Sequence, residues 1–421
     1  MISGLFEDSR CAVRTVAAYI DLNPVRAGRV KDPKEYRVGR CNQAHCFSSM
    51  SRRGFLLLAR SVWIPGNTEM APTLNDTRNW IDHAELAPDF RVAGSRPAFA
   101  EQRAEVRATL WRLLGRLPPR PKVSRVRTLA REDQGTHWRE CFEFDNGAGA
   151  TVPGVLLIPK QRARKAPAIL WNHWHGGQYD GGKSELFQSE HTPEVPGTTL
   201  VERGYVVMAI DAYCFGERNG RGPGGRSDKD GSGELTAAKF NLWAGRTLWG
   251  MIVRDDLLAL DYLCSRPEVD PQRIGTSGIS MGATRTWWLM ALDDRPRAGV
   301  AVCCLTRYRD LLEAQMLPAH GIYYFVPDLL HHFDTEAVIA CIAPRPFLSL
   351  AGADDSGSPA PGIQKIESAV LPAWQLFDRG EDFRSVLYPK IAHTYTPEMW
   401  REMLAWFETR LGSGVDEAAT S

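Results

Sequence analysis

Short apolar runs alternate with amphipathic stretches along the chain from about residue 167 onward. Apolar residues recur at helical spacing over 248–263 and 282–292. Apolar runs of strand length occur at 168–171, 205–210, 298–305, 346–350 and 383–387. Continuous apolar strands separated by amphipathic helices are typical of a parallel sheet that is buried on both faces. The pattern therefore predicts an α/β fold with a mostly parallel central sheet and helices on both of its faces.

The part of the chain before this alternation has a different pattern. Apolar side chains recur near helical spacing over 97–117, and the proline-rich run 118–121 predicts the end of that helix. Three short segments at 123–129, 141–144 and 152–158 are rich in strand-forming residues. They predict further strands before the parallel part of the sheet.

These patterns divide the chain into four parts. Residues 1–60 do not fit the alternation and form an N-terminal extension, while 61–122 hold a connector and the first helix. Residues 123–411 form the sheet-bearing domain, and 412–421 form a flexible tail. Inside the domain, 212–246 are rich in Gly, Arg and Asp, which predicts an irregular insertion that is either a lid or a plain surface loop.

Length and charge exclude several classes of partner. The 421 residues suffice for one large domain with an appendage. A formal net charge of +1 provides no overall attraction for nucleic acid or for an anionic membrane. No run approaches eighteen consecutive apolar residues, the length that crosses a bilayer. We therefore expect neither a nucleic-acid partner nor a membrane partner.

The cysteines indicate a reducing environment. Nine cysteines are scattered along the chain without metal-ligand spacing, and Cys303 and Cys304 lie in an apolar run that predicts a buried strand. This usage favours a cytoplasmic location. Export would require a start near Met50, which directly precedes the twin-arginine-like run 51–56, but the apolar segment that follows is too short.

The strongest chemical signal is the run Gly278-Ile279-Ser280-Met281-Gly282. It follows a strand-like segment at 273–277 and opens the predicted helix at 282. A nucleophile at such a strand-to-helix turn takes a strained backbone conformation, and small residues two positions away on each side let the chain close. We therefore predict that Ser280 is a catalytic nucleophile.

A serine nucleophile needs a base and an orienting acid, which follow it in the chain order Ser, acid, His. Asp354 and Asp355 both lie just beyond the predicted strand at 346–350. His393 is the only histidine after them, and it lies on a loop before a helix that begins at Thr396. We predict that His393 is the base and that one of the two aspartates orients it.

The oxyanion formed during acyl transfer needs preorganised N–H donors. The backbone N–H of Met281, next to the nucleophile, is one candidate, and Gly176 and Gly177 in the loop after the early strand at 168–171 provide the second. His173 and His175 in that loop suggest a metal site as an alternative, but no third ligand lies at suitable spacing. We predict no metal and no cofactor.

Trp174 lies beside this predicted oxyanion loop. An indole at that position is a candidate wall of the acyl pocket, and it would suit a small acyl group. The other tryptophans of the domain are more typical of core residues.

Together these motifs resemble a known family. Residues 100–411 resemble the acetyl xylan esterase and dienelactone-hydrolase-like branch of the α/β-hydrolases, to which the runs 343–346 and 215–218 are also similar. The spacing Gly-x-x-Asp-x-x-x-Pro in that family selects Asp355 over Asp354 as the acid. Dienelactone hydrolases carry a cysteine nucleophile, so Ser280 favours ordinary ester hydrolysis over the lactone reaction.

The N-terminal extension resembles a different family. Residues 1–40, with Ala17-Ala18-Tyr19-Ile20 and the run 21–28, resemble the C-terminal part of REP-associated tyrosine transposases. In that family the tyrosine at the position of Tyr19 attacks DNA with the help of a His-hydrophobic-His metal motif. No histidine precedes Tyr19 here, so we interpret the segment as a remnant.

The function expected from the sequence is hydrolysis of short-acyl, acetyl-type carboxylic esters through a Ser-His-Asp triad, on a small-molecule or carbohydrate substrate. One alternative is a peptidase of the prolyl oligopeptidase type, which shares the triad but usually carries a large propeller domain. A DNA-binding function through the N-terminal segment and a non-catalytic scaffold are the remaining alternatives.

Overall fold

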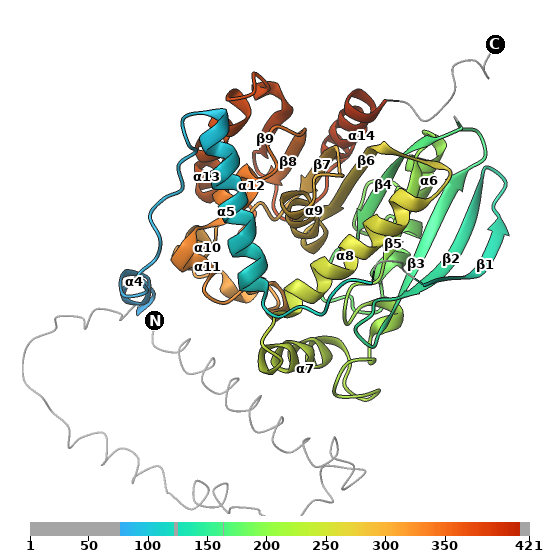
Figure 1. Cartoon of the computed structure of the whole chain (residues 1–421), viewed down its shortest axis with the longest axis horizontal. Helices are drawn as coiled ribbons and strands as arrows, with labels where there is room; N and C mark the ends of the chain where they lie inside the picture. The colour runs from blue at the N-terminus through green and yellow to red at the C-terminus, as the bar shows by residue number, and fades with distance from the viewer. Residues whose placement is uncertain (1–75, 122–124, 163, 413–421) are drawn as a thin grey trace, which may run out of the picture. The chain divides into compact units, whose positions relative to one another are not determined.

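A mixed sheet forms the centre of the protein in the computed structural model, which describes residues 76–121, 125–162 and 164–412 (Figure 1). Across these residues nine strands form one sheet in the order β1-β2-β3-β5-β4-β6-β7-β8-β9. The strands are β1 (Val126–Asp133), β2 (His137–Asp145), β3 (Thr151–Pro159), β4 (Ala166–Asn172), β5 (Val206–Ile210), β6 (Val269–Ile279), β7 (Ala298–Val302), β8 (Phe347–Gly352) and β9 (Phe383–Tyr388). The pairs from β1 to β3, and β3 with β5, are antiparallel, and every pair from β5 to β9 is parallel. The predicted mostly parallel sheet is confirmed.

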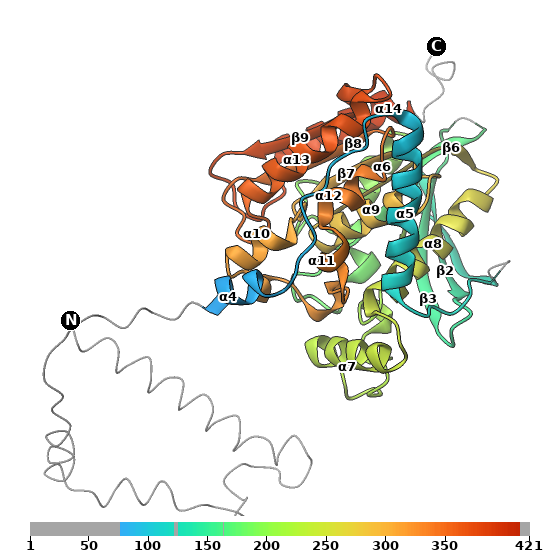
Figure 2. The same ribbon diagram turned by 60° about the vertical axis from the view of Figure 1, so that its left-hand side comes forward.

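Helices cover both faces of this sheet. On one face lie α5, α8, α9, α12 and α13, and on the other α6 and α14. Figures 1 and 2 show α8 and α9 lying along the strands and α7 projecting away from the sheet. The α-helices are α4 (Asp76–Asp82), α5 (Arg96–Leu114), α6 (Pro196–Glu202), α7 (Asp230–Trp243), α8 (Leu248–Ser265), α9 (Met281–Leu292), α10 (Tyr308–Glu313), α11 (Leu329–His332), α12 (Thr335–Ala340), α13 (Ala360–Gln375) and α14 (Pro397–Leu411). Short 3-10 helices include η2 (Gly182–Phe187), η3 (Gly216–Arg218), η4 (Leu317–Ala319), η5 (Ile322–Tyr324) and η6 (Gly380–Asp382).

The continuous apolar strands are explained by burial on both sides. Successive side chains of a strand point to opposite faces. In β5, Met208 packs in the cluster beneath α8 and α9, whereas its neighbours Val207 and Ala209 pack in the cluster beneath α14. All five residues of β5 are buried. Removing apolar area from water on both faces stabilises the sheet by roughly 25 cal/mol per Å².

Two predicted segments differ from the structure. The insertion at 212–246 contains the 14-residue helix α7, and the connector at 61–97 contains α4. Sequence pattern missed α7 because its first turn, Asp230-Gly231-Ser232-Gly233, consists of weak helix formers. Burial of Ala237 and Ala238 stabilises the helix through tertiary packing instead.

The strand predicted at 298–305 is also shorter than expected. It ends at Val302, and Cys303 and Cys304 follow with φ of 58° and 55°. A left-handed φ at a non-glycine residue breaks strand geometry. The two cysteines are therefore buried just beyond the carboxyl end of β7 and not within the strand, and Cys304 lies beside Ser280.

Among the described helices, none combines the length and the hydropathy needed to cross a membrane. The described residues all fall within one compact unit of the chain. The extension 1–60 with its transposase-like motif, and the tail beyond 412, lie outside the described residues.

Candidate active site

Ser280 lies at the junction between β6 and α9. Its φ of 58° and ψ of −118° place an L-residue in a sparsely populated region, at a cost of about 1–3 kcal/mol. The backbone N–H of Ser280 donates to the carbonyl of Val302 on β7 at 2.9 Å, which fixes the turn against the sheet. The strained turn presents the serine hydroxyl above the carboxyl end of the sheet, at the N-terminus of α9.

The two glycines of the motif are required by close backbone contact. A Cβ atom at Gly278 or at Gly282 would collide with the carbonyl oxygen of Asn172 at the end of β4. Asn172 is itself buried, and its amide donates to Thr276 and Thr286 at 3.0 Å each. The serine turn is therefore locked to the neighbouring strand β4.

Asp355 and His393 lie on the loops that follow β8 and β9. The imidazole Nδ1 of His393 is 2.7 Å from Oδ2 of Asp355, while Oδ1 of Asp355 accepts from the backbone N–H of Gly357 at 2.9 Å. The Asp355 side chain is 2% exposed and the His393 side chain 34% exposed. This arrangement fits a buried carboxylate that orients an accessible imidazole.

Asp354, the other candidate acid, is exposed, and its side chain forms no hydrogen bond or ion pair within the described part of the chain. Only its backbone N–H is engaged, with the carbonyl of Ile391. The structure thus brings Asp355, and not Asp354, to His393.

Ser280, Asp355 and His393 line one cavity of about 430 Å³. The predicted loop residues Trp174, Gly176 and Gly177 line the same cavity, as do His320 and Tyr323 from the segment that contains η4 and η5. All the predicted site residues except Met281 therefore border this space. Met281, the residue after Ser280, is buried as the first residue of α9.

The oxyanion candidates differ in whether their N–H groups are free. Met281 and Gly176 donate no backbone hydrogen bond to any described residue. The N–H of Gly177, in contrast, donates to Nδ1 of His175 at 3.0 Å. Gly176 has a φ of 47°, and a Cβ there would collide with the indole of Trp174. Met281 and Gly176 therefore remain available to an oxyanion, whereas Gly177 is already engaged within its own loop.

Glu234 is a site residue that the sequence pattern did not reveal. It lies on α7, is buried, and its Oε2 is 2.7 Å from Nε2 of His175 and 3.1 Å from the hydroxyl of Tyr179. Its Oε1 accepts from the backbone N–H of Tyr323 at 3.4 Å. Because Nδ1 of His175 accepts from Gly177, Nε2 carries the proton and donates to Glu234. One carboxylate thus holds the loop at 174–177 and the segment at 321–324 together.

Glu185 and His173 also support the loop at 174–177. Glu185 accepts from the indole N–H of Trp171 and from the backbone N–H of Trp174, both at 2.8 Å, and burial raises its pKa to about 7. His173 accepts at Nε2 from the N–H of Ala212 and donates from Nδ1 to the carbonyl of Trp174. Burial holds the pKa of His173 well below its ordinary value, so the ring is neutral.

These contacts bear on the metal alternative. Both ring nitrogens of His173 and of His175 are engaged in hydrogen bonds. Within the described residues, one group of three possible ligands lies close together: Cys303, Asp355 and His393, with ligand atoms within 4.8 Å of one another. Burial raises the pKa of the Cys303 thiol well above its ordinary value. Asp355 and His393 of this group are hydrogen-bonded to each other, which is the arrangement of a base and its orienting acid.

Cys304 lies beside the candidate nucleophile, with Sγ 3.9 Å from Oγ of Ser280. Burial, with a further contribution from the charge of Asp355, raises the pKa of this thiol to about 12. The thiol is therefore protonated at neutral pH, and a thiolate is the reactive form of cysteine.

Trp174 forms part of the cavity wall, and its role in an acyl pocket stays a prediction. Its indole stacks on the imidazole of His191, with ring centroids 3.4 Å apart. Trp171, Trp249, Trp287 and Trp288 are core residues, whereas Trp243 on α7 is exposed.

Comparison with known proteins shows which family this chain matches. Residues 77–358 match the profile of the Abhydrolase family. YtaP of Bacillus subtilis (strain 168), provisionally named a hydrolase, is 42% identical over 274 residues, which cover 65% of this chain and 88% of YtaP.

Solved structures share the fold at lower identity. A provisionally assigned acetyl xylan esterase from Bacteroides fragilis aligns with a TM-score of 0.59 and 19% identity, over 81% of this chain and 89% of that one. A glucuronoyl esterase from Solibacter usitatus aligns with a TM-score of 0.61 and 17% identity, over 78% of this chain and 100% of that one. The α/β-hydrolase fold predicted from the sequence is confirmed.

Proposed function

The chain belongs to the Abhydrolase family, and from that membership and its site we propose that it is a serine esterase acting on short-acyl carboxylic esters. The observation that carries the proposal is the common cavity shared by Ser280 at its strained turn and the Asp355–His393 pair. The fold-level likeness to an acetyl xylan esterase and to a glucuronoyl esterase supports an ester as the substrate.

The reaction proceeds by two acyl transfers. His393, oriented by Asp355, removes the proton of Ser280 as Oγ attacks the ester carbonyl carbon. The N–H groups of Met281 and Gly176 stabilise the oxyanion, and each such donor contributes on the order of 3–4 kcal/mol in a protease. His393 then protonates the departing alcohol. Water, deprotonated by the same imidazole, hydrolyses the acyl-enzyme and releases the acid.

The cavity walls support a small acyl group. Trp174 and Tyr323 are bulky rings at the cavity border, and Tyr323 stacks on His175 with ring centroids 5.0 Å apart. Bulky aromatic side chains in the wall favour a short acyl chain over a long alkyl chain. We therefore place the specificity at C2 to C4 acyl groups, on a small-molecule or carbohydrate alcohol.

The test is a series of p-nitrophenyl esters of increasing acyl length, with acetylated sugars assayed alongside. The proposal predicts the highest kcat/KM between C2 and C4. A rate that rises continuously to C10 would contradict the small acyl pocket, and no turnover of any ester by the folded protein would contradict the esterase assignment.

A further inference from the structure

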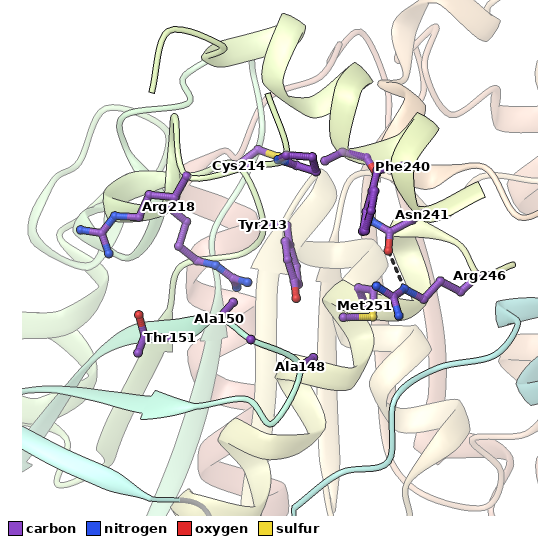
Figure 3. A pocket seen from close by; sticks show the side chains of 15 residues that line it. Ala148, Ala150, Thr151, Tyr213, Cys214, Arg218, Phe240, Asn241, Arg246 and Met251 are labelled. Carbon is purple, nitrogen blue, oxygen red and sulfur yellow. Dashed lines mark hydrogen bonds between the residues drawn. The ribbon is translucent and has the colours of Figure 1, made fainter. Parts of the chain in front are cut away.

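A second cavity, of about 500 Å³, lies beside the C-terminal half of α7 (Figure 3). It lies between the loop that joins β2 to β3, the segment after β5, and α7. Ala237, Phe240 and Met251 form apolar parts of its wall. The cavity shares no lining residue with the one that contains Ser280.

The charged residues that line this cavity are all cationic. They are Arg218, Arg221 and Arg246, and no carboxylate is among the lining residues. Arg246 donates from Nε to Oδ1 of Asn241 at 2.7 Å, which fixes its guanidinium at the cavity wall (Figure 3). Within the described part of the chain, neither Arg221 nor Arg246 forms an ion pair with a carboxylate.

Arg218 is buried, and its guanidinium is only partly satisfied. Nη1 donates to Asp255 at 2.9 Å and to the carbonyl of Asp211 at 3.1 Å, whereas Nη2 is buried without a partner. The guanidinium lies 3.7 Å from the ring centroid of Tyr213, and Figure 3 shows the two side chains next to each other. An unsatisfied buried donor on a charged group is costly, and this N–H group is therefore available to a bound acceptor.

The carboxylates near Arg218 are each matched by a cation, so the excess positive charge of the cavity comes from Arg221 and Arg246. Asp255 is shared between Arg218 and Arg254, whose Nη1 lies 3.6 Å away. Asp211 pairs with Lys183 at 2.8 Å. The cavity therefore keeps an excess of positive charge against partly apolar walls.

We propose that this second cavity is a binding site for a small organic carboxylate, held by Arg246, Arg221 and Arg218. Guanidinium groups present planar paired donors that match a carboxylate, and the apolar wall accommodates the organic part of the ligand. Neither the triad nor the ester reaction is required for this binding. Helix α7 contributes Glu234 to the active site and Phe240 and Asn241 to this cavity. One helix therefore borders both sites.

The experiment is isothermal titration of the full-length protein with benzoate, and with its neutral isostere benzamide. Benzoate carries the planar carboxylate on an apolar ring that suits the wall. Inorganic phosphate provides a separate arm that tests for a site specific to inorganic anions. The variants are Arg246→Ala and Arg221→Ala, and the matched control is Arg401→Ala, which removes an exposed arginine from α14. Circular dichroism verifies that each variant is folded.

The proposal predicts that benzoate binds and benzamide does not, and that Arg246→Ala weakens benzoate about tenfold or more. Arg401→Ala should bind as the wild type does. Equal binding of benzoate and benzamide, binding of phosphate alone, or the absence of any binding would overturn the proposal. Unchanged affinity in folded Arg246→Ala and Arg221→Ala would also overturn it, since benzoate would then occupy another site.

Discussion

Ser280 has a backbone conformation that its own side chain disfavours, with φ at 58°. Three contacts hold it there: its N–H bond to Val302 and the close approach of Gly278 and Gly282 to the carbonyl of Asn172. Such strain persists only where the surrounding structure determines the conformation. At this residue the surrounding structure consists of two buried strands, β4 and β7, which explains why the hydroxyl is rigidly placed.

The two adjacent aspartates provide a direct test of the orienting acid. Asp355→Asn should lower kcat by about 10⁴, because an amide opposite Nδ1 favours the wrong imidazole tautomer. Asp354→Asn, the matched control one residue away, should change kcat little because its side chain is exposed. Steady-state kinetics on p-nitrophenyl acetate measure both. The reverse order of effects would mean that Asp354 is the acid.

Glu185 provides a pH-dependent contribution to stability. Its pKa is about 7 in the folded protein against an ordinary value of 4.5, because the carboxyl group is buried. Between these values the folded state holds a proton that the unfolded chain has lost, so stability falls as the pH rises through this window. Relative to Glu185→Gln, the wild type should lose stability from pH 5 to pH 8 in urea unfolding. Parallel pH profiles for the two proteins would contradict this prediction.

Among helices and strands, the sequence pattern predicted those site residues whose position follows from the order of the elements along the chain. Ser280 and His393 each lie in a loop next to a well-patterned strand, so their positions followed from the order of elements. Glu234 did not, because its partners His175 and Tyr323 are 59 and 89 residues away in the chain and meet it only in the folded protein. The sequence pattern also did not show that β7 ends at Val302, because Cys303 and Cys304 are as apolar as the residues of a buried strand.

We expect Glu234 to position the oxyanion loop. Glu234→Ala should lower kcat by about tenfold to a hundredfold, less than the 10²–10³ seen for loss of an oxyanion donor, and should change KM less. Glu234→Gln, which can still accept from Nε2 of His175, should recover part of kcat. Lys239→Ala is the matched control, since Lys239 is an exposed residue of α7. If Glu234→Ala and Lys239→Ala gave the same kinetics, α7 would have no role in the site.

At the scale of the whole molecule, the sheet brings the functional loops together. The loops after β4, β6, β8 and β9 all lie at the carboxyl ends of parallel strands, and ligand sites of α/β proteins lie at that edge. Apolar runs and helical spacing predicted this architecture because burial on both faces of a sheet leaves a strong signal in sequence. The same signal is weak for α7, which projects from the sheet.

The N-terminal extension should contribute nothing to catalysis. The match to the Abhydrolase family covers 77–358, and 1–60 lie outside it. The transposase resemblance of this segment also implies a chemistry other than ester hydrolysis. A chain of residues 61–421 should therefore keep kcat and KM within about twofold of the full chain. A loss of activity beyond tenfold, with an unchanged thermal midpoint, would show that the extension forms part of the active-site wall.

If Ser280 carries the acyl group, a reagent that forms a stable covalent adduct with the catalytic nucleophile should label Ser280 and no other residue. Diethyl p-nitrophenyl phosphate should add one diethylphosphoryl group to the wild type, with release of one equivalent of p-nitrophenol, and peptide mass spectrometry should locate it on Ser280. Folded Ser280→Ala should remain unlabelled and lose ester hydrolysis by several orders of magnitude, about 10⁶ in a well-studied protease. Labelling of another residue such as Cys304, or near-wild-type turnover by Ser280→Ala, would contradict the account.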